Sequence, residues 1–176
     1  MSDIVFKMTD ERILFWSCKP PYGFLSNFYY HPMQMGLYTA ISSENFYQAA
    51  KSYHQDKEFS LKVLRAPSSR EAKALASHGP VDHRWDLEIE YVTGEKWLWK
   101  DLVMLRVLEH KFSHPDLQIA LWNTGTKKLA ENSPYDGYWG LGPNQLGSNK
   151  LGLLLEKVRT RKRFEYPQPI QDLFVN

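Results

Sequence analysis

The chain has 176 residues, which is enough for one well-buried core and short for two, so a single domain is expected. Its 22 Lys and Arg residues nearly balance its 20 Asp and Glu residues, and a formal charge of +2 excludes the overall basic character of a typical nucleic-acid-binding protein. The single cysteine, Cys18, excludes an intrachain disulfide. The sequence shows neither a signal-peptide pattern nor a run of about 20 apolar residues, so we expect a soluble, cytoplasmic protein with no membrane partner.

The first fifty residues predict a small β-element followed by a helix. Residues 12–16 have the pattern of a short buried strand, and residues 33–39 that of a hairpin turning near Gly36. A turn-rich loop over residues 22–29 lies between them. Ser42 and Ser43 are candidate N-caps for a helix that carries Glu44.

Helical patterns dominate the rest of the chain. A helix over residues 56–65 should stop before Pro67, because the residue ahead of a proline disfavours helical backbone. A capping box at residues 68–71 predicts a helix over 72–78, and further helices are expected over 95–112, over 116–122 and after Ser148. We therefore expect an α+β, mainly α-helical single domain over residues 1–163, with a small N-terminal β-element and a C-terminal tail or strap over 164–176.

The helix after Ser42 divides its side chains between two faces at about 100° per residue. One face carries an acid, a phenol, an amide and an amine: Glu44, Tyr47, Gln48 and Lys51. The opposite face is an apolar stripe: Phe46, Ala49, Ala50 and Tyr53. Any surface helix shows a similar division to water, so a solvated polar face is the alternative to a functional one.

Residues 132–147 form a glycine-rich loop that holds one carboxylate, Asp136, among aromatic side chains. Such a loop can cradle a phosphate near the helix start at Ser148, but the Lys-Ser/Thr ending of a nucleotide-hydrolase loop is missing. The loop is thus either a wall of an active site or a plain surface loop.

No metal or cofactor is expected from the pattern. His110 and His114 are four residues apart, yet they lack the Glu of a zinc-protease helix and are followed by Pro115, so they predict a surface pair. Cys18 has no neighbouring base that would make it a nucleophile. The basic run over residues 159–163 is typical of a solvated helix C-terminus.

Two carboxylates on separate elements, Glu44 and Asp136, suit cleavage of a glycosidic bond. That reaction develops positive charge at the anomeric carbon of the sugar, which carboxylates stabilise, and one of them can activate water. The amine of Lys51 offers another route, attack on the open-chain aldehyde of a ribose to form a Schiff base.

Five separated motifs between about residues 15 and 163 together resemble the NADAR (YbiA-like) family. They are Phe24-Leu25-Ser26-Asn27-Phe28, then Ser43-Glu44-x-x-Tyr47-Gln48-Ala49-x-Lys51, Arg84-Trp85, Asp136-x-Tyr138-Trp139-Gly140-x-Gly142, and Asn149-Lys150-Leu151-Gly152 with Arg159. The resemblance implies a helical α+β fold and N-glycosidase activity on ribosides. Some members of that family hydrolyse ribosylamino phosphate intermediates of riboflavin biosynthesis, and others remove ADP-ribose from guanine in DNA.

The resemblance also assigns roles to residues. It implies that Glu44 is the catalytic acid, Asp136 a second carboxylate near the ribose, and Lys51 either a Schiff-base or a phosphate-binding group. Trp85 would stack on the substrate. The other substrate-binding positions it implies are Asn27, Phe28, Gln48, Tyr138, Trp139, Gly140 and Asn149. Leu141 departs from the family pattern, because many relatives have an acidic or polar residue there.

The hypothesis is an N-glycosidase that hydrolyses the C1′–N bond of phosphorylated N-ribosides without a cofactor. Its substrate is either a small ribosylamino-pyrimidine phosphate or ADP-ribose attached to guanine, in which case ADP-ribosylated DNA is a partner. The alternative from another class is a non-catalytic ADP-ribose or nucleotide-binding module, which the departure at Leu141 favours. A purely structural protein would need all the aromatic residues in the core.

Overall fold

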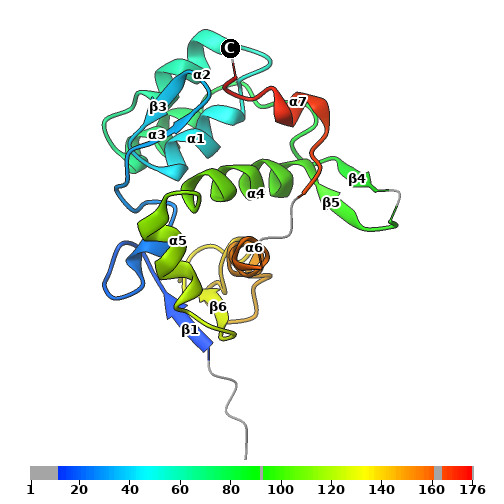
Figure 1. The fold of residues 1–176 in the computed structure, drawn as a ribbon. Coiled ribbons are helices and arrows are strands. Elements are labelled where there is room, and N and C mark those ends of the chain that lie inside the picture. The colour runs from blue at the N-terminus through cyan, green and yellow to red at the C-terminus, as the bar shows by residue number, and fades with distance from the viewer. Residues whose placement is uncertain (1–11, 92, 161–163, 176) are drawn as a thin grey trace, which may run out of the picture.

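The computed structural model describes residues 12–91, 93–160 and 164–175 (Figure 1). Its helices are α1 (Ser43–Ala50), α2 (Lys57–Leu64), α3 (Ser69–Ala76), α4 (Trp99–Lys111), α5 (Pro115–Trp122), α6 (Lys150–Arg159) and α7 (Gln168–Gln171). Its strands are β1 (Arg12–Phe15), β2 (Met33–Met35), β3 (Tyr38–Ala40), β4 (Glu88–Glu90), β5 (Lys96–Leu98) and β6 (Lys128–Glu131). A 3₁₀ turn covers Gly23–Leu25. The predicted α+β, mainly helical fold is confirmed.

Helix α4 runs through the middle of the molecule (Figure 1). Helices α1, α2 and α3 lie on one side of it with strands β2 and β3, and α5, α6, β1 and β6 lie on the other. Because it packs against α1 on one side and α6 on the other, α4 buries side chains around most of its circumference, Asp101 and Lys111 included. A helix enclosed in this way sets the distance between the two halves of the core.

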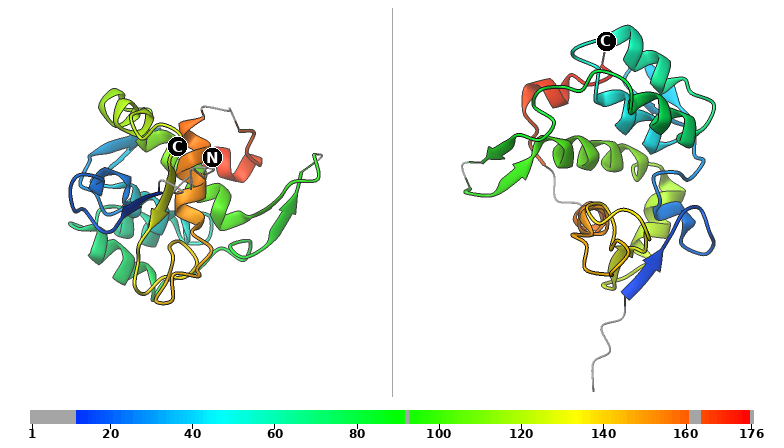
Figure 2. Two further views of the ribbon diagram at one scale, coloured as in Figure 1. Left: turned by 90° about the horizontal axis from the view of Figure 1, so that it is seen from below. Right: turned by 180° about the vertical axis from the view of Figure 1, so that it is seen from behind.

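In the part of the chain that the structure describes, the strands form three two-stranded sheets. β2 and β3 make the predicted antiparallel hairpin, and Gly36 in its turn has a φ of 55° that favours glycine. β4 and β5 form a second hairpin that projects from the body of the molecule (Figure 2). β1 pairs in parallel with β6, with Arg12 opposite Lys128, and so joins the beginning of the described chain to the segment ahead of the 132–147 loop.

Strands β4, β5 and β6 were not expected from the sequence. The helix expected over 95–112 begins only at Trp99, because residues 96–98 pair with β4 and Leu98 has an extended ψ of 143°. Strand β6 was not expected, since Lys, Ala and Glu have low strand propensity and the partner strand lies far away in the sequence. The β-structure is therefore not confined to the N-terminal region.

Capping side chains set the starts of the short helices. Asp56 accepts a hydrogen bond from the backbone N–H of Phe59 (2.9 Å) at the start of α2. Ser68 caps α3, accepting from the N–H of Glu71 (3.1 Å) and donating to its carboxylate (2.9 Å). The helix expected over 72–78 therefore begins at Ser69, three residues earlier, and ends at Ala76.

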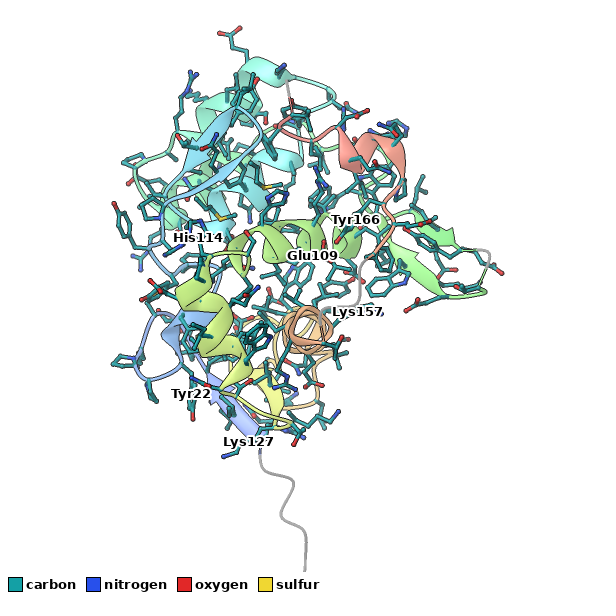
Figure 3. The ribbon with its side chains drawn as sticks, in the orientation of Figure 1. Tyr22, Glu109, His114, Lys127, Lys157 and Tyr166 are labelled. Carbon is teal, nitrogen blue, oxygen red and sulfur yellow. The ribbon has the colours of Figure 1, made fainter. Side chains whose placement is uncertain are left out.

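Residues 164–175 cross α4 and end in the core. Tyr166 donates a hydrogen bond to Glu109 Oε2 on α4 (2.7 Å), and the two side chains lie together in Figure 3. Phe174 is fully buried, with its ring centroid 5.0 Å from that of Phe46 and 4.7 Å from that of Tyr53. The tail therefore covers the apolar stripe of α1. Of the basic run, residues 161–163 lie outside the described residues, and Arg159 donates to the carbonyl of Lys127 (2.9 Å).

Among the described residues, every helix is too short or too polar to cross a membrane.

Replacement of Phe174 by Ala should lower the free energy of unfolding by about 3–5 kcal/mol, because it leaves a cavity beneath α1. Urea denaturation measures the change. Val175→Ala is the control, since Val175 is exposed and its truncation should change stability by less than about 0.5 kcal/mol. Equal effects of the two substitutions would show that the tail does not contribute to the core.

Candidate active site

A cavity of about 540 Å³ opens between α1, α3, the N-terminal end of α4 and the loop after β6. Most of the residues that the sequence nominated line it: Asn27, Phe28, Glu44, Gln48, Lys51, Trp85, Asp136, Tyr138 and Trp139. These positions come from four separate segments of the chain. The fold therefore brings the predicted motifs to one place.

Helix α1 provides the polar wall of the cavity. The backbone N–H of Asn45 donates to the Ser42 hydroxyl (3.3 Å), which fixes the start of the helix. The backbone N–H of Glu44 donates to the carbonyl of Asn27 (3.1 Å), so the first turn is tied to the 22–29 loop. Every residue of α1 is buried, so the solvated-face alternative was wrong. Its polar face borders the cavity while its apolar stripe meets the core.

The Glu44 carboxylate is held inside this wall, with the residue only 5% exposed. Gln48 Nε2 donates a hydrogen bond to its Oε1 (2.8 Å). Burial raises the pKa of Glu44, and Asp136 adds to the rise, whereas the Gln48 hydrogen bond and the charges of Lys73 and Lys51 act in the opposite direction. The Glu44 carboxylate is therefore removed from water, and the Gln48 hydrogen bond and the two lysine charges offset part of the cost of burying its charge.

Gln48 has a second, unused polar atom. Its Oε1 is buried and has no hydrogen-bond partner among the described residues. An amide oxygen only accepts hydrogen bonds, so an N–H or O–H group of a bound molecule could donate one to it.

Aromatic rings form the opposite walls. The ring of Tyr47 lies 5.2 Å from that of Trp85 and 5.5 Å from that of Trp139, centroid to centroid. Lys51 Nζ lies 5.9 Å from the centre of the Trp85 ring. Burial lowers the pKa of Lys51, although the charge of Glu44 opposes this shift. Flat ring walls beside an amine suit a ligand that has both a planar base and a charged group.

The loop after β6 places the second predicted carboxylate. Asp136 Oδ1 accepts hydrogen bonds from the backbone N–H groups of Tyr138 (2.9 Å) and Trp139 (2.8 Å). Tyr138 in turn donates to Asp101 Oδ1 on α4 (2.6 Å), and Lys150 at the start of α6 lies 3.3 Å from the other oxygen of Asp101. The loop is thus fixed to both α4 and α6, and Asp136 keeps one oxygen for the cavity.

Comparison with known proteins identifies the family. A family model described as the NADAR domain matches residues 14–163. The chain belongs to the NADAR domain family.

Several relatives within and around this family have names that state an activity. The chain is 31% identical over 161 residues to N-glycosidase YbiA of Shigella flexneri serotype 5b, covering 90% of this chain and 92% of that protein. It is 32% identical to an N-glycosidase of Nostoc punctiforme (86% and 92% covered) and 31% identical to a riboflavin biosynthesis protein of Vibrio vulnificus (89% and 40% covered). The names of the first two confirm, at the level of reaction class, the prediction of a hydrolase acting on N-glycosyl bonds.

A solved structure has the same fold. The NMR structure of Escherichia coli YbiA superposes with a TM-score of 0.73 at 30% sequence identity, covering 88% of this chain and 86% of that one. The predicted resemblance to the NADAR family is therefore confirmed by both sequence and structure.

Two nominated residues do not reach the cavity. Asn149 has a left-handed φ of 49° and bridges β6 to α6, accepting from the N–H of Glu131 (3.1 Å) and donating to the carbonyl of Leu129 (2.8 Å). Gly140 is buried against the carbonyl of Glu131, where a side chain would collide. In this chain these two residues fix the shape of the loop and do not line the cavity.

Four charged residues of the cavity were not expected from the sequence: Arg70, Lys73, Lys100 and Glu131. Arg70 and Lys73 lie one helical turn apart on α3, a spacing visible in the sequence, but nothing there showed that α3 faces α1. Glu131 ends the strand that was not expected. Burial and the charges of Asp136 and Glu44 raise the pKa of Glu131 to about 7, while Lys73 opposes the rise.

The residues considered for other chemistry lie elsewhere. Cys18 is exposed and its thiol pKa is raised by burial of the sulfur, which disfavours a nucleophilic thiolate. The His114 ring packs edge-on against His31, with 4.5 Å between centroids. Among the described residues, no group of three or more His, Cys, Asp or Glu side chains could hold a metal ion.

A buried lysine supports the floor of the site. Lys111 Nζ on α4 donates a hydrogen bond to the carbonyl of Ser26 (2.7 Å), and Ser26 lines the cavity. Burial lowers the pKa of Lys111 to about 7, so its amine is largely neutral above that pH. The contact fixes the loop that carries Asn27 and Phe28.

The titration of Lys111 predicts a pH dependence of stability. The folded chain releases this proton near pH 7, whereas the unfolded chain holds it up to the ordinary value of 10.5, so the free energy of unfolding should rise with pH between the two. Lys111→Met removes this contribution. Urea denaturation at several pH values should show a shallower rise in the variant, while Lys62→Met, at an exposed position of α2, keeps the rise of the original protein. Identical slopes for Lys111→Met and the original protein would contradict the buried titration.

Proposed function

We propose that the protein is a cytoplasmic N-glycosidase that hydrolyses the C1′–N bond of phosphorylated N-ribosides. The observation that carries the proposal is the Glu44 carboxylate, buried in a ring-lined cavity that also contains Gln48, Lys51, Trp85 and Asp136. Carboxylates in such a site stabilise the positive charge that develops at C1′ as the bond to nitrogen breaks. The names of the N-glycosidase relatives support the same reaction.

The charges around the cavity support a phosphorylated substrate. Four cations line it from two helices, α3 and α4, and from the turn after α1: Lys51, Arg70, Lys73 and Lys100. Lys100 Nζ is paired with Asp86 (2.7 Å) and lies 4.2 Å from the Tyr138 ring centre. Arg70 and Lys73, on the neighbouring helix α3, make no ion pair with any described residue, so they are available for a phosphate group. The aromatic walls would then hold the base.

Two substrates fit this description, a ribosylamino-pyrimidine phosphate and ADP-ribose attached to guanine. The first is favoured by the riboflavin biosynthesis protein among the relatives and by the near-neutral charge of the chain. The second would add a nucleic-acid partner, and its hydrolysis would fall steeply with salt. Mass spectrometry of the products distinguishes them. Hydrolysis of the first releases a free pyrimidine and a ribose phosphate, whereas hydrolysis of the second releases ADP-ribose and leaves unmodified guanine in the DNA.

The non-catalytic alternative loses its one argument. Leu141 is buried and does not line the cavity, so a polar residue there would not contact the substrate directly. A reader would show thermal stabilisation by ADP-ribose with no released base or sugar.

Lys51 is assigned to attack on C1′. Burial lowers the pKa of Lys51, which increases the fraction of neutral, nucleophilic amine. Because Arg70 and Lys73 line the same cavity and can bind the phosphate, Lys51 is not needed for that role. Treatment of the enzyme and substrate with borohydride should therefore give a reduced sugar adduct on Lys51, found by peptide mass spectrometry. Lys51→Arg should lose both the adduct and turnover. A missing adduct together with a raised KM and unchanged kcat in Lys51→Arg would instead assign Lys51 to phosphate binding.

Glu44→Gln should lower kcat by about 10²- to 10⁴-fold, because it removes the charge that stabilises C1′. The fold should remain intact. Since burial raises the pKa of Glu44, the ionised carboxylate destabilises the folded state above that pKa, and the variant should melt at the same or a higher temperature at neutral pH. Product formation and thermal melting measure the two effects, with Glu58→Gln on the exposed side of α2 as the control. Full activity in Glu44→Gln would refute the assignment.

A further inference from the structure

We propose that Glu131, which lines the cavity beside two other acids and has no side-chain partner among the described residues, is the proton donor to the leaving nitrogen. The carboxylate cluster consists of Glu44, Glu131 and Asp136, all of which line the cavity. The inference rests on the proposed N-glycosidase function and deepens it. Nothing in the sequence pattern pointed to Glu131, because it ends the unexpected strand β6.

The three carboxylates have different partners. Glu44 accepts a hydrogen bond from Gln48, and Lys51 and Lys73 both favour its charged form. Asp136 accepts two backbone N–H bonds at one oxygen. In the part of the chain that the structure describes, the Glu131 carboxylate makes neither a hydrogen bond nor an ion pair.

The charges that face Glu131 come from every side of the cavity. They are Glu44 and Lys51 near α1, Arg70 and Lys73 on α3, Lys100 on α4, and Asp136 on the loop. The two acids raise the pKa of Glu131 and Lys73 lowers it, while partial burial is the largest cause of the rise. Three carboxylates close together cannot all be ionised without a large penalty, so the proton resides on the one without donors.

The position of Glu131 suits proton donation. It lies at the end of β6, held by hydrogen bonds of its backbone to Asn149 (3.1 Å) and Leu141 (2.8 Å), so its main chain is rigid. The free Oε1 of Gln48, buried at the same cavity, provides an acceptor for a substrate N–H or O–H group. A substrate held there has its ribose between the acids and its base against the rings.

The proton balance follows from the reaction. The C1′–N bond breaks, its electron pair stays on nitrogen, and that nitrogen takes the proton of Glu131 and leaves as a neutral amine. Water oxygen finally replaces nitrogen at C1′, directly or by hydrolysis of the Lys51 imine, and a proton of that water returns to the carboxylate cluster. An acid that titrates near neutrality is matched to this transfer.

The first experiment is a pH profile of kcat and KM for the original protein, Glu131→Gln and Glu131→Asp. With a ribosylamino-pyrimidine phosphate as substrate, kcat of the original protein should fall as pH rises through about 7, because Glu131 loses its proton. Glu131→Gln should lower kcat by about 10²- to 10⁴-fold, with little change in KM, and should lose this descending limb. Glu131→Asp retains an acid, so it should have a higher kcat than Glu131→Gln and should keep a descending limb in the pH profile. Glu88→Gln, on the exposed β4–β5 hairpin, is the control for loss of a carboxylate.

The second experiment observes the proton directly. Carboxyl carbon NMR of protein labelled at glutamate should show one side chain that titrates near pH 7 and is missing from Glu131→Gln. A limb that persists in Glu131→Gln, or the absence of such a resonance, would overturn the assignment while leaving an active N-glycosidase. An original protein that hydrolyses neither substrate class would instead overturn the proposed function and the donor role with it.

Discussion

The burial of one carboxylate organises this protein. Glu44 lies in the first turn of a helix that is enclosed on all sides, so its charge depends on what surrounds it rather than on water. Gln48 one turn later supplies a hydrogen bond, and the backbone of Asn27 fixes the start of the helix. A buried carboxylate without such partners would take up a proton or leave the core. The contacts with Gln48 and Asn27 thus allow the Glu44 carboxylate to remain buried at the cavity.

Helix α4 holds the walls of the cavity in position. Helix α4 separates the half that carries α1 from the half that carries the 132–147 loop, yet both halves contribute walls to one cavity. Asp101 receives the Tyr138 hydroxyl and lies near Lys150, and Lys111 binds the carbonyl of Ser26. These contacts tie the loops of each half to α4. Buried polar side chains on the central helix therefore fix the relative positions of cavity residues that are remote in sequence.

Differences among the three acids of the cavity give the site its chemistry. The three carboxylates differ in their hydrogen-bond donors: the Gln48 amide for Glu44, two backbone N–H groups for Asp136, and none for Glu131 among the described residues. Carboxyl groups whose environments separate their proton affinities can divide the work of acid and base. The cations on α3 balance the summed charge and face the side where a phosphate would bind.

The sequence by itself determined the helices with strong caps, the two faces of α1 and the family motifs, because these depend on spacing along a few turns of chain. Ser42, Asp56 and Ser68 cap as their residue types predict, and Glu44, Gln48 and Lys51 share a face by helical periodicity alone. Only the tertiary structure decided that β6 pairs with β1, that α3 turns Arg70 and Lys73 toward α1, and that Glu131 joins Glu44 and Asp136. Those arrangements depend on contacts between distant segments, and local propensity carries no information about which distant segment will cover a given face.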